Sequence, residues 1–105
     1  MAVTGELELA VMEILWSRPV RLSVREVHEL LSADRDLAYT TVMTVLDRLA
    51  KKGLVLRKLE GRAWLYFPTK SRADEAASEV RELLSRLSLA ERTQVLAQLN
   101  STAVC

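Results

Sequence analysis

Residues 39–51 show a clear separation of apolar and polar positions. Their apolar side chains follow the i, i+3, i+4, i+7 spacing of a helix with one buried side, at Val42, Val45, Leu46 and Leu49. The opposite side carries short hydroxyl and methyl groups followed by a base, at Thr40, Met43, Thr44, Asp47 and Lys51. Gly53 follows, and glycine ends a helix at positive φ with little strain. The pattern predicts a helix with one core-facing side and one free polar side.

Two runs rich in strand-forming residues come next, at residues 54–59 and 63–67, with a turn between them. Gly61 stands in that turn, where a short connection needs a positive φ. Arg57, Lys58 and Arg62 make the predicted hairpin basic. A helix that leads through a glycine cap into a basic two-stranded ribbon is the order of a winged helix-turn-helix. The alternative interpretation is a packed helix and hairpin whose charges are merely solvated.

The chemistry of both elements suits duplex DNA. Threonine offers a hydroxyl to base edges and a methyl group to the thymine methyl, while lysine and arginine reach phosphates. The basic residues of the helix are Arg48, Lys51 and Lys52, at its far end. On the predicted wing they are Arg57, Lys58 and Arg62.

Charge distribution favours the same surface. The net charge of the whole chain is only +1. Residues 1–38 have a net charge of −3, residues 39–72 of +6 and residues 73–105 of −2. The positive charge is therefore concentrated on the helix and hairpin, as expected for a nucleic-acid footprint on an otherwise acidic molecule.

Residues 6–17 predict a helix that is apolar on two sides. Its main stripe is Leu7, Ala10, Val11, Ile14 and Leu15. A second line, formed by Leu9, Met12 and Trp16, lies off that stripe, so we expect something beyond its own core to cover it. Residues 20–22 can form a short strand against the wing. Ser23 and Glu26 then form a capping box that starts the next helix, and a polar loop at residues 32–36 follows.

Helical spacing returns after Thr69. The apolar positions follow the alternating four- and three-residue steps of a heptad seam, widened by Ala76 and Leu83, at Ala73, Ala77, Val80, Leu84 and Leu87. A second capping box, from Ser88 to Glu91, opens a last helix that carries Leu96. These helices either pack on their own domain or join two subunits. We favour a dimer because one winged domain reads only a few base pairs. Leu9, Met12 and Trp16 of the first helix are expected to take part in the dimer contact as well.

The predicted fold is therefore mainly α with a small β wing. Residues 1–70 are expected to form a winged-helix DNA-binding domain, and residues 71–105 a short helical dimerisation region. No stretch approaches the roughly 20 apolar residues of a membrane span, and the N-terminus lacks a basic start. We predict a cytoplasmic protein without membrane insertion.

The sequence offers little for catalysis or metal binding. Its one histidine, His28, is expected to be hydrogen-bonded at the edge of the core, and no Cys-His cluster or glycine-rich phosphate loop is present. Trp16 and Trp64 are expected to fill the core and the wing. The single cysteine, Cys105, can form no internal disulfide, which fits a reducing compartment. We predict neither an enzyme nor a protein with a cofactor or metal.

Three segments, residues 5–16, 23–28 and 37–54, resemble the penicillinase-repressor (BlaI/MecI/CopY) family. The resemblance implies a homodimeric transcriptional repressor whose winged helix binds a palindrome with TACA and TGTA half-sites. By position, Thr40, Thr41, Met43 and Thr44 match the family's base-facing residues, and Arg48, Lys51 and Arg62 match phosphate contacts. Tyr39, which opens the helix in the matched segment, is added to the expected DNA contacts.

The chain also departs from the family pattern. The C-terminal region is short, and no segment matches the site that a membrane sensor protease cuts in antibiotic-sensing members. Copper sensing is disfavoured because Cys105 is the only cysteine. We predict a dimeric repressor that acts by operator occlusion. The alternative is a protein-interaction module that uses Leu9, Met12 and Trp16, and its binding to duplex would lack a steep salt dependence.

Overall fold

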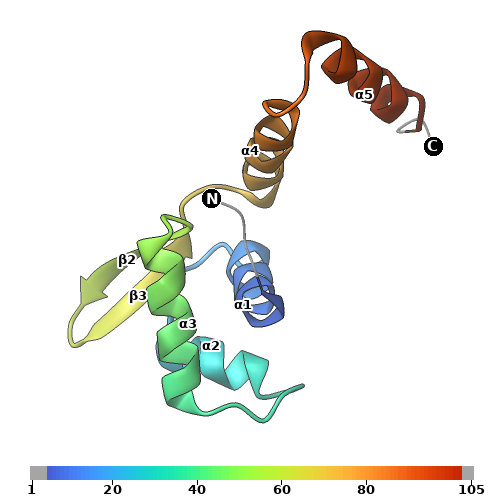
Figure 1. Ribbon diagram of the computed structural model, residues 1–105. Helices are drawn as coiled ribbons and strands as arrows, with labels where there is room; N and C mark the ends of the chain where they lie inside the picture. Colours follow the sequence, from blue (N-terminus) through green and yellow to red (C-terminus); the bar gives the residue numbers. More distant parts are fainter. Residues whose placement is uncertain (1–4, 103–105) are drawn as a thin grey trace.

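The computed structural model describes residues 5–102 and contains five helices and three strands (Figure 1). In chain order they are α1 (Glu6–Ser17), β1 (Leu22–Ser23), α2 (Val24–Leu31), α3 (Tyr39–Lys51), β2 (Val55–Glu60), β3 (Ala63–Pro68), α4 (Arg72–Leu84) and α5 (Leu89–Thr102). The first three helices gather against the small sheet, and α4 and α5 project away from it one after the other (Figure 1). The fold is a winged helix, as predicted, and we refer to α4 and α5 together as the arm.

Local hydrogen bonds set the helix ends that the sequence predicted. Before α2, the Glu26 amide donates to Ser23 Oγ at 3.1 Å, and the Ser23 amide donates to Glu26 Oε1 at 2.9 Å. This is the predicted capping box. At the end of α3, Gly53 has a φ of 77°, and the Leu54 amide donates to the Leu49 carbonyl at 3.0 Å. Together with the Gly53 amide on Ala50 this is a Schellman cap, which confirms the predicted role of Gly53.

The sheet is antiparallel with strand order β1-β3-β2. Glu60 lies opposite Ala63, so Gly61 and Arg62 form the turn, and Gly61 has the predicted positive φ, at 61°. The short strand that pairs with the wing is present, but it is Leu22–Ser23 rather than residues 20–22. Val20 is exposed instead, and Leu22 reaches the core opposite Tyr66.

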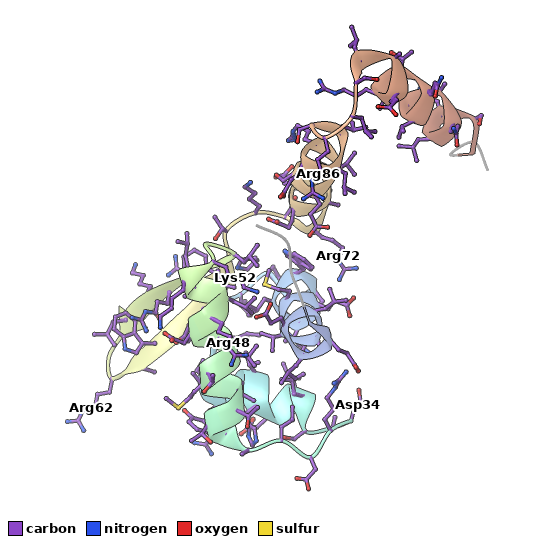
Figure 2. The ribbon with its side chains drawn as sticks, viewed as in Figure 1. Asp34, Arg48, Lys52, Arg62, Arg72 and Arg86 are labelled. Atoms are coloured by element: carbon purple, nitrogen blue, oxygen red, sulfur yellow. The ribbon has the colours of Figure 1, made fainter. Side chains whose placement is uncertain are left out.

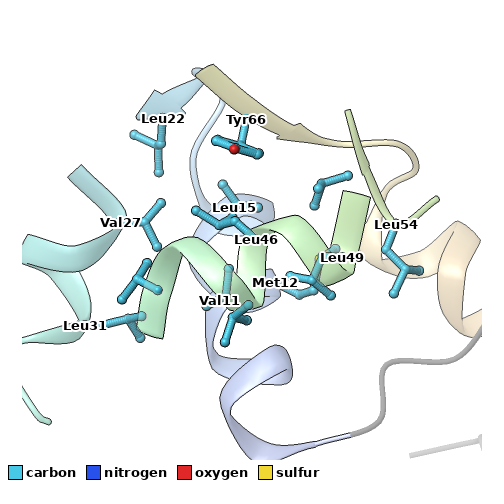
Figure 3. Close-up of a cluster of buried hydrophobic side chains, with 13 residues drawn as sticks. Val11, Met12, Leu15, Leu22, Val27, Leu31, Leu46, Leu49, Leu54 and Tyr66 are labelled. Atoms are coloured by element: carbon cyan, nitrogen blue, oxygen red, sulfur yellow. The ribbon is translucent and has the colours of Figure 1, made fainter. Parts of the chain in front are cut away.

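The hydrophobic core lies between α1, α2, α3 and the sheet (Figure 3). Its buried residues are Val11, Met12, Leu15, Leu22, Val27, Leu31, Val42, Val45, Leu46, Leu49, Leu54, Val55 and Tyr66. The four predicted core positions of α3 are all among them. Each fully buried aliphatic side chain contributes about 1.5–3 kcal/mol, so this cluster holds the winged helix together without any residue of the arm.

Helix α1 is rotated relative to the prediction. Met12, expected on an uncovered second line, is only 1% exposed and belongs to the core. The buried positions of α1 are Glu8, Val11, Met12 and Leu15, which follow the i, i+3, i+4, i+7 spacing. Leu7, Ala10 and Ile14 of the predicted stripe are only partly buried at its edge. The buried stripe contains a glutamate, and a reading based on apolar residues alone therefore places its centre wrongly.

The arm leaves its apolar side chains uncovered. Leu83 is 60% exposed and Val80 is 40% exposed, and Leu89, Leu96 and Leu99 are exposed as well. Apart from the first half of α4, which contacts α1, these helices do not pack on their own domain within a single chain. Leu87 lies outside α4, which ends at Leu84, so the predicted seam is one position shorter.

The arm's helix starts follow from local capping. Ser71 Oγ accepts from the Asp74 amide before α4, and Ser88 and Glu91 form the predicted capping box before α5. The Ser88 amide, which donates to the Glu91 carboxylate at 2.9 Å, lowers the pKa of Glu91, and the hydrogen bond with the Ser88 side chain adds to that shift.

Across residues 5–102, no helix is long and apolar enough to cross a membrane.

Candidate nucleic-acid interface

A groove of about 670 Å³ separates α3 from the wing. One wall is α3, the other is the hairpin, and α2 closes one end. The groove is lined by Ser23, Val24, Arg25, Tyr39, Met43, Thr44, Asp47, Arg57, Arg62, Ala63, Trp64 and Tyr66. Five of the predicted DNA contacts line this concave surface, namely Tyr39, Met43, Thr44, Arg57 and Arg62. Thr40 is exposed on α3 but is not part of the groove lining.

Thr44, on the exposed side of α3, presents a methyl group and not a free donor. Thr44 Oγ1 donates to the Thr40 carbonyl at 3.0 Å, one helical turn earlier. A hydroxyl has one hydrogen to donate, so Thr44 offers a partner its methyl group and its oxygen lone pairs. Met43, which is exposed beside it, adds a second apolar contact. This surface suits the thymine methyl that lines a major groove.

The wing carries a stacked arginine and an arginine at its tip. The Arg57 guanidinium lies over the Trp64 ring, 4.5 Å from its centroid, across the two strands. This cation–π contact holds the Arg57 charge on the groove side of the hairpin. Arg62 follows Gly61 in the turn and extends from the end of the hairpin into open space (Figure 2).

Lys58 is on the other face of the hairpin. Side chains alternate along a strand, so Lys58 points away from the groove that its neighbour Arg57 lines. Lys58 was expected to share the phosphate contacts of Arg57, and the structure does not bring it to that surface. Alternation along the strand would have distinguished the two residues from sequence.

The two lysines at the end of α3 have different surroundings. Lys51 is exposed and pairs with Asp47 one turn earlier, at 3.1 Å. Lys52 pairs with Glu8 of α1, with 2.7 Å between Nζ and Oε1, and their side chains are only 22% and 9% exposed. The expected role of Lys52 in DNA contact is therefore corrected. Its ammonium group is held in the joint between α1 and α3, where it compensates the buried Glu8 carboxylate.

The remaining predicted contacts sit on the flanks of α3. Arg48 is exposed but does not line the groove, and Thr41 is half-buried. Tyr39 lies at the start of α3 with its ring edge-on to the His28 imidazole, at 5.8 Å between centroids. His28 Nε2 lies 2.7 Å from the Leu37 carbonyl oxygen, which confirms a hydrogen-bonded imidazole at the edge of the core.

Arg25 and Trp64 are among the groove residues that were not predicted as contacts. Arg25 lines the groove from α2, and its ion pair with Glu29, one turn later, gave it the sequence pattern of a solvated helix face. Trp64 was expected to fill the wing, yet it is exposed and forms the platform for Arg57. Its position diagonal to Arg57 in the hairpin register is the pattern that indicates this contact.

The part of the chain that the structure describes contains no group of three or more metal-binding side chains arranged around one point. Cys105 lies outside the described residues, so its role stays a prediction.

Comparison with known proteins identifies the family. The sequence model of the penicillinase repressor family matches residues 4–103 of this chain. The chain belongs to the penicillinase repressor family. It is similar to the transcriptional regulator BlaI of Mycobacterium tuberculosis, with 55% identity over 82 residues, covering 78% of this chain and 59% of that protein. It is also similar to the penicillinase repressor of Bacillus licheniformis, with 31% identity over 82 residues, covering 78% of this chain and 63% of that protein.

Solved structures of the family share the winged helix. The DNA-binding domain of the repressor BlaI superposes with a TM-score of 0.61 at 32% identity, covering 68% of this chain and 85% of that one. The monomeric form of Bacillus licheniformis BlaI in complex with the blaP half-operator gives a TM-score of 0.57 at 32% identity, with the same coverage. The relatives named here are regulators and repressors, not enzymes. The chain spans about six tenths of the length of these relatives.

Proposed function

We propose that this member of the penicillinase repressor family is a sequence-specific DNA-binding repressor. It binds as a homodimer to a palindromic operator with TACA- and TGTA-like half-sites and represses by occluding the operator in the cytoplasm. The observation that carries the proposal is the groove between α3 and the wing, which combines a methyl-rich helix surface with arginines on the opposite wall.

Base reading is assigned to α3. The major groove of B-DNA is wide enough to admit an α-helix, and thymine is distinguished there by its methyl group. Thr40, Met43 and Thr44 lie on the exposed side of α3 with their neighbours turned to the core. The related BlaI structure in complex with a half-operator supports the same use of the domain.

Phosphate contact is assigned to the arginine and lysine side chains around this surface. Arg57 and Arg62 line the groove from the wing, Arg25 lines it from α2, and Lys51 stands exposed near the end of α3. The ion pairs that Lys51 and Arg25 form with their helix neighbours are solvent-exposed. Such pairs contribute about 0.3–0.5 kcal/mol, so a phosphate can replace the carboxylate at little cost.

Dimerisation is assigned to the arm. Its uncovered apolar side chains, which a single chain leaves in water, gain the most from a second copy. The proposed contact residues are Ala73, Ala77, Val80, Leu83, Leu84 and Leu96. Leu9 of α1 is 44% exposed and can extend this surface. The family resemblance adds a membrane-bound sensor protease as a candidate partner, although no segment of this chain matches the family's cleavage site.

The alternative interaction module is not favoured. It needs an uncovered line through Leu9, Met12 and Trp16, but Met12 is in the core. Trp16 Nε1 donates to the Lys70 carbonyl within the same chain, at 3.0 Å. Only Leu9 of the three stays free for a partner, which is too little for a specific interface.

The proposal is tested by titrating the full chain with three duplexes at several salt concentrations. These are a palindrome with both half-sites, a duplex with one half-site, and a random sequence of equal length. We expect specific binding to exceed random binding by roughly 10³-fold or more, and log affinity to fall with log salt by about 0.9 per neutralised phosphate. Equal affinity for all three duplexes, or binding insensitive to salt, would contradict it.

A further inference from the structure

Each residue of the connection between the winged helix and the arm takes part in a hydrogen bond. Only residues 69–71 separate β3 from α4. The Thr69 amide donates to the Leu54 carbonyl at 3.0 Å, and its Oγ1 donates to the Gly53 carbonyl at 2.8 Å. Ser71 caps α4 through the Asp74 amide. A connection this short, in which each residue takes part in a hydrogen bond, cannot act as a flexible linker.

Trp16, in the last turn of α1, joins the connection to the arm. Its Nε1 donates to the Lys70 carbonyl at 3.0 Å, the middle residue of the connection. The Arg72 guanidinium, from the first turn of α4, lies over the same ring at 5.4 Å from its centroid. One side chain of the winged helix therefore contacts both the residue before the α4 cap and the residue after it.

The contact between α1 and α4 involves the first half of α4. Glu75 is 7% exposed, and a small groove lined by Leu9, Trp16, Glu75 and Ala76 lies between the two helices. Farther along α4, Val80 and Leu83 are exposed. Figure 1 shows α4 leading away from the winged helix after this first contact. The direction of the whole arm is thus decided around Trp16.

We propose that Trp16 is a positioning residue that fixes the direction of the arm and thereby sets which half-site spacing the dimer accepts. This inference rests on the proposed binding of a palindrome by a homodimer. Two winged helices joined through their arms can occupy two half-sites together only if each arm holds its winged helix at a matching angle. A single half-site makes no such demand, so Trp16 should matter for the palindrome and not for the half-site.

Trp16→Phe isolates this role. The substitution removes the Nε1–H donor to Lys70 and keeps an aromatic ring under Arg72. Arg72→Leu is the complementary change, because it removes the cation and leaves the hydrogen bond. Both residues lie outside the hydrophobic core cluster, although Trp16 packs against it. Thermal unfolding, measured alongside, shows whether either variant remains folded.

The test measures arm direction and DNA binding in the full chain. Spin labels on cysteines at Ala33 and Arg81, both exposed, report the distance between the winged helix and α4 in a Cys105→Ser background diluted with unlabelled protein. We expect Trp16→Phe to broaden this distance distribution. The ratio of palindrome affinity to half-site affinity should fall roughly tenfold, with half-site affinity unchanged and with tolerance for altered half-site spacing. Trp64→Phe, which changes the other tryptophan, is the control for the distance measurement and should leave it unaltered.

The outcomes separate the inference from the proposed function. A distance distribution in Trp16→Phe that matches the wild type would overturn the role of Trp16. A broadened distribution with an unchanged affinity ratio would overturn its role in operator selection. A wild type that binds palindrome and half-site equally would instead contradict the dimeric repressor, while the label distances would still decide whether Trp16 holds the arm.

Discussion

At the scale of single residues, the hydroxyl of Thr44 already has its hydrogen bond. Oγ1 donates to the Thr40 carbonyl in the free protein. A side chain that reads DNA from this position therefore contributes chiefly through its methyl group, and the hydroxyl serves the helix. The structure thus assigns the methyl group and the hydroxyl of Thr44 to different roles, which the sequence alone could not do.

We predict that Thr44→Val retains affinity for the preferred half-site, because valine keeps the methyl group. Thr44→Ser and Thr44→Ala should each lose about 1 kcal/mol, the transfer free energy of one buried methyl group. Fluorescence anisotropy on matched half-site and random duplexes measures the effect. Losses of equal size on random DNA would show that α3 does not read bases at this position.

Two adjacent lysines provide a matched pair for the phosphate contacts. Lys51→Ala should weaken binding to all duplexes alike and reduce the salt slope by about one, since one phosphate contact is lost. Lys52→Ala should leave the salt slope intact and destabilise the fold by about 1–3 kcal/mol, because Glu8 loses its partner in the joint between α1 and α3. Salt titrations and urea unfolding measure the two effects. A reduced salt slope in Lys52→Ala would show that Lys52 contacts DNA after all.

At the scale of elements, the wing depends on the conformation of its turn. Gly61 has a φ of 61°, and a Cβ added there would meet no atom within 4 Å. A substitution is therefore opposed by backbone strain alone and not by crowding. Asparagine tolerates this region much better than a β-branched residue does.

Gly61→Val should accordingly weaken operator binding while the core and its unfolding transition persist. The strained turn costs about 1–2 kcal/mol, which the hairpin can relieve by displacing Arg62 from the duplex. Gly61→Asn is the control and should bind close to the wild type. Affinity of Gly61→Val equal to that of Gly61→Asn would mean that the wing tip does not contact DNA.

At the scale of the whole molecule, the arm makes the chain elongated, with extents of 52 × 25 × 22 Å. Val80 and Leu83 of α4 are exposed, and Leu84, one turn after Val80, is half-buried. In a dimer, each such side chain removed from water contributes about 1.5–3 kcal/mol. An interface of this kind tolerates charge poorly, since an unpaired buried carboxylate loses its hydration.

Val80→Asp combined with Leu84→Asp should therefore give a folded monomer. Palindrome affinity should approach half-site affinity, a loss of about 10²-fold or more as the avidity of two sites disappears. The control carries Asp at Gln94 and Gln98, one turn apart on the side of α5 opposite Leu96, and should remain dimeric. Light scattering at micromolar concentration measures the assembly. A dimeric Val80 and Leu84 variant, or a monomeric wild type, would contradict the assignment of the arm as the dimer contact.

The sequence by itself determined the order of the elements and several of their ends. The core side of α3, the capping boxes at Ser23 and Ser88, and the positive φ of Gly53 and Gly61 follow from the sequence and are present in the structure. Each depends on residues no more than a few positions apart, where spacing and backbone sterics decide the outcome. The order of these elements was enough to predict a winged helix.

Tertiary structure decided how the elements face one another. Glu8 belongs to the buried stripe of α1 because Lys52, distant in sequence, meets it there, and that ion pair both rotates α1 and removes Lys52 from the DNA surface. The contact of Trp16 with Lys70 and Arg72 likewise depends on where α1 ends relative to β3. Apolar periodicity carries no information about such pairs, because their polar atoms are stabilised only once the chain has brought the two partners together.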